Sequence, residues 1–260
     1  MSMQAAPSSS VNHWPDSKCA RAFWGQHELP AYQRLLADTA EWLDPHAGER
    51  WLDLGCGSGQ LTKTLWEKSR GALAEAAALD CAPANERVIN RLRGQMQPPA
   101  DERLHFVHAD FSSGLAGWAN ERFDGVVSGL AIQYAESYSE ETGGWTTDAY
   151  EHLLCEISRV LKGGGRFVFS VNVPEPAWGR VGVRSLAGIL RSPKPGRYLK
   201  NMLRMYRYGR WLTRESRRGR FHYLPIQSIV THLIDAGFVR IEHRLTYCDQ
   251  AYLIRCRKAS

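Results

Sequence analysis

The sequence predicts an α/β protein built on a doubly wound, seven-stranded and mostly parallel β-sheet with helices on both faces. Three observations lead to this fold class. Short apolar runs alternate with longer segments of helical periodicity, which is typical of β-α-β units. The first apolar run ends in a glycine-rich turn, and the last two are separated by a short turn near Asp249, which predicts a closing hairpin. With 260 residues, 43% of them hydrophobic, the chain can bury one large core.

The first 44 residues predict an N-terminal tail and a helical cap in front of a main domain at 45–260. Residues 1–10 are polar and uncharged, without the order of a signal peptide. Residues 30–43 repeat apolar side chains at helical spacing behind a proline suited to a first turn.

The main domain reads as strands and helices in alternation. Five parallel strands are expected at 50–54, 74–79, 104–110, 123–128 and 166–171. Helices are expected at 60–69, 83–93 and 148–161, the last ended by the glycines from Gly163. An insertion at about 174–224 follows, and then a helix at 225–236 and two antiparallel strands at 238–245 and 251–257.

The glycine-rich turn follows the first strand, where Gly55, Gly57 and Gly59 occupy every second position. Glycine permits positive φ and lets a ligand approach the backbone. A strand that turns into a helix in this way can hold a nucleotide-like ligand at the helix N-terminus. The NAD fingerprint G-x-G-x-x-G would require glycine at position 60, and Gln60 stands there, which disfavours an NAD oxidoreductase.

The hydrophobic-Asp-hydrophobic run before G-x-G-x-G resembles motif I of the class I S-adenosylmethionine (SAM) dependent methyltransferases. The resemblance covers residues 45–172 closely and 225–257 loosely, and it implies a Rossmann-like sheet of strand order 3-2-1-4-5-7-6 with strand 7 antiparallel. The simple loop after the fourth strand resembles the small-molecule group that includes the quinone-biosynthesis C-methyltransferases. The implied cofactor is SAM, with S-adenosylhomocysteine as product.

The resemblance also implies which residues bind SAM. Asp53 lies near the amino group, and Asp80, 25 residues after Gly55, accepts from the ribose hydroxyls. Asp110 accepts from the adenine amino group, and Phe111 packs on the ring. The full predicted set is Asp53, Gly55, Cys56, Gly57, Gly59, Asp80, Cys81, Asp110, Phe111, Ser128 and Leu130. No metal is expected, because no Cys/His cluster has zinc-ligand spacing.

Methyl transfer from a sulfonium needs mainly positioning, and a base only when the acceptor must lose a proton. The candidate bases are Tyr134, His222, Tyr223 and His232. Two signatures are missing: the Asp/Asn-Pro-Pro-Tyr run used on planar exocyclic amines, and a cysteine placed for pyrimidine C5 methylation. A small-molecule or lipid-like acceptor is therefore expected.

The insertion carries the basic charge of the chain. Residues 174–224 hold 13 Lys and Arg against two acids, while the whole chain has a net charge of +6. A helix at 197–212 would place bases on one face and Leu199, Met202, Leu203 and Tyr206 on another. Three roles remain open for the segment 197–220: a lid over the active site, a contact with an anionic membrane, or a contact with nucleic acid. Arg217 and Arg218 lead us to expect an anionic acceptor.

Three functional classes remain. The first is a small-molecule methyltransferase, the second an RNA methyltransferase that uses the basic insertion, and the third a non-catalytic SAM-binding partner or regulator. The six scattered cysteines favour reduced thiols and a cytoplasmic location. The sequence contains no run of about 18 apolar residues, so we expect no membrane-spanning helix. The sequence leaves the oligomeric state and the acceptor atom open.

Overall fold

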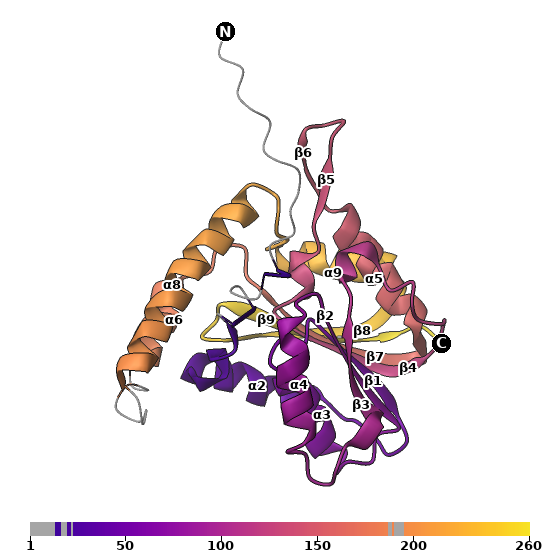
Figure 1. Ribbon diagram of the computed structural model, residues 1–260. Coiled ribbons are helices and arrows are strands. Elements are labelled where there is room, and N and C mark those ends of the chain that lie inside the picture. Colours follow the sequence, from indigo (N-terminus) through magenta and orange to yellow (C-terminus); the bar gives the residue numbers. More distant parts are fainter. Residues whose placement is uncertain (1–13, 17–19, 22, 187–188, 190–194) are drawn as a thin grey trace.

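The computed structural model describes residues 14–16, 20–21, 23–186, 189 and 195–260, and the predicted tail at 1–10 lies outside them. A seven-stranded sheet of order β3-β2-β1-β4-β7-β9-β8 forms the centre of the molecule (Figure 1). Its strands are β1 (Arg50–Leu54), β2 (Glu75–Asp80), β3 (Leu104–His108), β4 (Phe123–Gly129), β7 (Leu161–Asn172), β8 (Phe238–Thr246) and β9 (Ala251–Lys258). The pairs from β3 to β7 are parallel, and β9 is antiparallel to both β7 and β8.

The predicted strand order is confirmed, because β7, β8 and β9 are the fifth, sixth and seventh strands of this sheet. The numbering is shifted by a separate two-stranded hairpin, β5 (Ser137–Ser139) and β6 (Gly144–Thr146), which the sequence analysis did not predict. The other difference lies at β7, which begins at Leu161 directly after the helix and contains the three glycines expected to separate the two elements.

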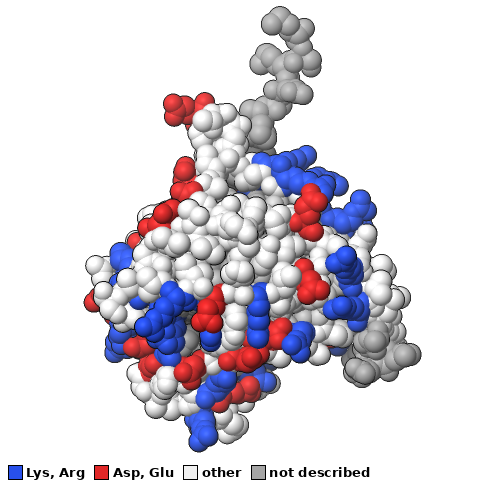
Figure 2. All heavy atoms as spheres, turned by 180° about the vertical axis from the view of Figure 1, so that it is seen from behind, with Lys and Arg blue, Asp and Glu red and all other residues white. Residues whose placement is uncertain are grey.

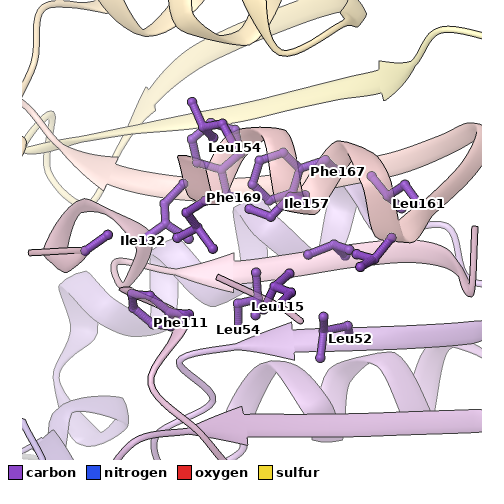
Figure 3. Close-up of a cluster of buried hydrophobic side chains, with 14 of the residues drawn as sticks. Leu52, Leu54, Phe111, Leu115, Ile132, Leu154, Ile157, Leu161, Phe167 and Phe169 are labelled. Atoms are coloured by element: carbon purple, nitrogen blue, oxygen red, sulfur yellow. The ribbon is translucent and has the colours of Figure 1, made fainter. Parts of the chain in front are cut away.

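Helices cover both faces of the sheet. They are α2 (Pro30–Trp42), α3 (Gln60–Lys68), α4 (Ala84–Arg93), α5 (Asp148–Val160), α6 (Trp178–Ser185), α8 (Pro195–Arg217) and α9 (Ile226–Asp235). One face packs against α5 and α9, and the cluster of buried leucine, isoleucine and phenylalanine side chains on that face is shown in Figure 3. The other face packs against α2, α3 and α4 around Trp51 and Trp66, both of which are fully buried.

The insertion forms α6 and α8, which lie together beside the sheet rather than on it (Figure 1). Gly209 of α8 allows the close approach, because a Cβ at this position would lie 2.7 Å from the Trp178 ring of α6. The indole Nε1 of Trp178 donates to Thr213 Oγ1 at 2.8 Å. The insertion therefore contains two helices that pack against each other.

Candidate active site

The turn from β1 into α3 has the backbone that its glycines predict. Gly55, Gly57 and Gly59 have φ of +69°, +52° and +75°, values that other residues adopt only at a cost. The amides of Gly55 and Cys56 both donate to the Leu79 carbonyl oxygen, at 2.9 and 3.0 Å, which ties the turn to the end of β2. A Cβ at Gly57 would meet nothing within 4 Å, so this glycine borders open space.

The other two glycines of the turn are needed for packing. A Cβ at Gly59 would lie 2.5 Å from Ile89 Cδ1, so Gly59 lets α3 approach α4 and is not among the residues that line the crevice described below. A Cβ at Gly55 would lie 2.3 Å from the Ala131 Cβ. Gly55 does line the crevice, as does Cys56, a buried free thiol.

Asp53 is a buried acid with an unused acceptor. The side chain lies at the end of β1 and is 1% exposed. Its Oδ2 accepts a hydrogen bond from Thr62 Oγ1 at 2.6 Å, and its Oδ1 has no partner. Burial raises the pKa of Asp53 to about 7, and the nearby Asp80 charge adds to the shift. Asp53 is one of the residues that line the crevice described below, and an unpartnered buried carboxylate oxygen there fits a cationic hydrogen-bond donor such as an ammonium group.

Asp80 closes β2 and is held by backbone amides. Its Oδ2 accepts from the Gly57 amide and its Oδ1 from the Ala82 amide, both at 2.9 Å. Burial nevertheless raises the pKa of Asp80 above its ordinary value. The side chain of Asn85, which the sequence analysis did not single out, lies against this carboxylate and accepts from Trp24 Nε1 at 2.7 Å. The neighbouring Cys81 also lines the crevice.

The loop after β3 brings Asp110 and Phe111 to the same edge of the sheet. Asp110 Oδ1 accepts from the Ser112 amide at 2.9 Å and so caps the short 3-10 turn Phe111–Ser113. Both residues line the crevice, so Asp110 combines a capping role with a place at the site.

At the end of β4 the structure separates two residues that the sequence analysis grouped. Ser128 is fully buried, and its hydroxyl donates to the Leu54 carbonyl oxygen at 2.8 Å, which joins β4 to β1. The crevice is lined instead by Gly129 and Leu130. Leu130 has φ of +54°, a strained value for leucine, and its amide donates to the Ser170 carbonyl oxygen at 3.0 Å.

These residues form one side of a crevice at the carboxyl ends of the parallel strands, where open α/β sheets bind ligands. The space between the lining atoms is about 1510 Å³, including the open mouth. The other side comes from the N-terminal segment, α6 and α8, and it is mostly apolar; its members include Trp14, Phe23, Trp178, Val181, Met202 and Met205. Among the described residues that line the crevice, the charged ones are Asp53, Asp80 and Asp110, and none is Lys, Arg or His.

Tyr134 also lines the crevice and belongs to a buried polar group. Its hydroxyl lies 3.1 Å from the Tyr223 hydroxyl and 3.5 Å from Asn172 Nδ2. Burial raises the pKa of Tyr134 to about 12, and the pKa of Tyr223 is raised as well. Asn172 lines the crevice and was missed by the sequence analysis, whereas Tyr223 lies behind Tyr134 rather than at the cavity wall.

His222 and His232 lie away from the crevice. His222 is 3% exposed, its Nε2 donates to the Ala135 carbonyl oxygen at 2.8 Å, and burial lowers its pKa. The expectation that it acts as a base does not fit this placement, because the ring is committed to the loop between β4 and β5. His232 Nδ1 lies 3.8 Å from Glu151 Oε1, on the pair α5 and α9.

The arginines at the end of the insertion are not among the residues that line the crevice. Arg217 pairs with Glu175 at 3.4 Å and Arg218 with Glu215 at 3.0 Å, and both side chains are largely exposed. Arg220 pairs with the half-buried Glu136 at 2.8 Å. The expectation of an anionic acceptor held by Arg217 and Arg218 therefore has no support in the lining of the crevice.

The comparisons with known proteins agree with this geometry. Residues 52–169 match the family model described as a methyltransferase domain. This segment is a methyltransferase domain. The resemblance to class I SAM-dependent methyltransferases is thus confirmed, and the matched segment includes the glycine turn, Asp80, Asp110 and β4.

Solved structures extend the likeness over the rest of the chain. A chain of the Haloferax volcanii complex between the Trm112 methyltransferase activator and a methyltransferase has a TM-score of 0.62 at 17% identity; the match covers 96% of this chain and 98% of that one. Human N-acetylserotonin methyltransferase, solved with SAM, has a TM-score of 0.59 at 16% identity, over 98% of this chain and 60% of that one. At these identities the likeness establishes the fold.

Curated relatives share only part of their length with this chain. The 23S rRNA (uracil(1939)-C(5))-methyltransferase RlmD of Vibrio vulnificus is 27% identical over 125 residues, which are 47% of this chain and 27% of that protein. The chain covers less than a third of the curated relatives that it matches.

Proposed function

We propose that this protein transfers a methyl group from SAM to a neutral, apolar small-molecule or lipid-like acceptor, and that it works in the cytoplasm. The observation that carries the proposal is the two-sided crevice, with three acids at the strand ends and an apolar wall opposite. SAM bears a sulfonium and an ammonium, and nearby carboxylates favour such a cation. The same three acids disfavour an anionic acceptor.

The residues at the strand ends fit SAM in the roles that the resemblance implies. Asp53 offers its unpartnered Oδ1 to the ammonium group. Asp80 has acceptor capacity left for ribose hydroxyls, and Gly57 leaves room beside it. Asp110 and Phe111 would hold the adenine. When bound, SAM supplies an electrophilic methyl group on a good leaving group; that no metal takes part stays a prediction.

The apolar wall would hold the acceptor and exclude water. Tyr134 is the polar group best placed on this side, next to Asn172. With a pKa of about 12 its hydroxyl stays protonated at neutral pH, so it would orient the acceptor as a hydrogen-bond donor rather than remove a proton. Tyr223 would hold the Tyr134 hydroxyl in place.

The test is turnover of SAM to S-adenosylhomocysteine with matched acceptors that differ only in a remote phosphate group. We expect the neutral acceptor of each pair to be methylated and Asp80→Ala to lose SAM binding. Preference for the phosphorylated acceptor would contradict the proposal. SAM binding without turnover of any acceptor would favour a non-catalytic SAM-binding partner.

An RNA acceptor is the second candidate, favoured by the ribosomal RNA methyltransferases among the relatives and by the basic insertion. RNA binding weakens steeply with salt, because bound phosphates release counterions. Methylation of RNA whose KM rises more than tenfold between 50 and 200 mM salt, the rise that about two phosphate contacts predict, would favour this candidate.

A further inference from the structure

Helices α6 and α8 carry an outward surface of exposed apolar side chains. Eight large apolar side chains are exposed in the described part of the chain, and five of them lie on this pair or directly after α6: Val183, Leu186, Leu199, Leu203 and Tyr206. Val183 is 67% exposed and Leu203 is 55% exposed. We call this surface, with the basic side chains described below, the α6–α8 face.

Three stripes run along α8 at intervals of three and four residues. The inner stripe consists of the buried Tyr198, Gly209 and Leu212 and the half-buried Met202 and Met205. The next stripe, exposed and apolar, consists of Leu199, Leu203 and Tyr206, and the third, exposed and basic, of Lys200, Arg204 and Arg207. The single apolar side expected from the sequence is therefore divided: Met202 faces inward, while Leu199 and Leu203 face outward.

The α6–α8 face is strongly basic. In Figure 2 the molecule is turned so that α8 lies on the right, and Lys and Arg side chains follow that side. Six exposed bases form no ion pair with any residue that the structure describes: Arg180, Arg184, Lys200, Arg207, Arg210 and Arg214. The surface thus presents aliphatic side chains beside uncompensated positive charge.

We propose that the α6–α8 face docks on an anionic lipid bilayer. Aliphatic side chains gain free energy when they enter the acyl boundary, and bases beside them gain from anionic headgroups. The phosphates of a nucleic acid would pair with the Lys and Arg side chains, but a nucleic acid offers little to Val183, Leu199 or Leu203. The nucleobases of single strands stack on aromatic side chains rather than on aliphatic ones. A second copy of the face would bring like charges together. None of the described helices is long and apolar enough to cross a membrane, so contact would be with the surface.

Docking would place the crevice at the membrane surface. The inner sides of α6 and α8 form part of the apolar wall, and Tyr206 both lines the crevice and is 42% exposed. The rim of the crevice therefore lies next to the exposed apolar stripe. Resting on the proposed function, this arrangement indicates an acceptor that is dissolved in the bilayer and enters the crevice directly from it.

The test is co-sedimentation of the full chain with vesicles of phosphatidylcholine alone and with 30 mol% phosphatidylglycerol. We expect binding to the anionic vesicles that weakens with added salt. Each base near an anionic surface contributes about fivefold to partitioning, so Lys200→Glu/Arg207→Glu should lower it at least about twentyfold. The matched control Arg87→Glu/Arg91→Glu, on exposed positions of α4, changes the net charge equally and should bind like wild type.

The apolar contribution is tested in parallel. Leu199→Asp/Leu203→Asp should lose vesicle binding, whereas Ile234→Asp/Val239→Asp, at exposed apolar positions on α9 and β8, should keep it. Equal binding by all four variants, no binding to anionic vesicles, or salt-sensitive binding of transfer RNA in place of vesicles would overturn the proposal. Calorimetric SAM titration separates the two proposals, because a chain that binds SAM but not vesicles rejects only the docking, and the reverse result rejects only the function.

Discussion

Replacing Asp53 with asparagine tests whether the buried carboxyl group has a raised pKa and destabilises the folded chain when it ionises without a cation beside it. Burial raises the pKa of Asp53 from an ordinary 3.8 to about 7. The unfolded chain therefore releases this proton near pH 4, while the folded chain holds it up to about pH 7. Between those values the folded state binds more protons than the unfolded one, so Asp53 lowers stability as the pH rises. The difference between the pKa values of Asp53 in the folded and the unfolded chain corresponds to a loss of about 4 kcal/mol in the free energy of unfolding once both states are ionised.

Asp53→Asn removes the ionisation but adds an amide nitrogen next to the position of Oδ1, which has no partner. That unmet donor costs about 1–3 kcal/mol, so we expect a net gain of about 1–3 kcal/mol in the free energy of unfolding at pH 8. Urea unfolding at pH 5 and pH 8 measures this. Between pH 5 and pH 8 the free energy of unfolding of the wild-type protein should fall by about 3 kcal/mol more than that of the variant.

Asp235→Asn is the control, since Asp235 is exposed at the end of α9. This variant should follow the wild-type curve. Parallel curves for wild type and Asp53→Asn would show that Asp53 ionises normally in the folded chain and would refute the reasoning. Under the proposed function, SAM affinity of the wild type should also fall about tenfold for each pH unit below 7, because the cation needs the ionised carboxylate, and Asp53→Asn should bind weakly without this dependence.

Three further predictions concern the other residues of the site. Gly57→Val should weaken SAM binding at least tenfold by calorimetry, because the side chain would enter open space of the crevice from a backbone at φ +52°, and unchanged affinity would exclude this turn from the site. His222→Ala should lose about 2–4 kcal/mol of stability in urea but leave the pH profile of kcat unchanged, since its ring packs inside the protein; a shifted profile would restore it as a base. Tyr223→Phe should raise the acceptor KM severalfold with little change in SAM affinity, because it frees the Tyr134 hydroxyl, and an unchanged KM would remove Tyr134 from the acceptor side.

The parts of the fold that the sequence predicted are those encoded locally. The apolar runs predict the positions of the strands. The three glycines of the turn predict a backbone with positive φ, which other residues adopt only at a cost. The expected strand order came from the resemblance to the class I methyltransferases, and right-handed connections between the parallel strands are compatible with it. The resemblance implied the roles of Asp80 and Asp110, and both line the crevice because the carboxyl ends of parallel strands share one edge of the sheet.

The parts that the sequence did not predict depend on long-range packing. The division of α8 into an inner and an outer apolar stripe is decided by its contact with Trp178 on α6, 31 residues from Gly209. His222 looked available because nothing nearby in the sequence reveals the Ala135 carbonyl that it contacts. Ser128 could not be told from Leu130, since alternation along a strand end does not say which of them turns toward the ligand.

The most direct measurement is a calorimetric titration of SAM into the wild-type chain and Asp80→Ala. A crevice built to hold the adenosine and methionine parts of SAM predicts one saturable binding event per chain in the wild type and a loss of at least tenfold in affinity in the variant. No heat of binding in the wild type, or equal affinity in both proteins, would contradict the placement of SAM at these strand ends.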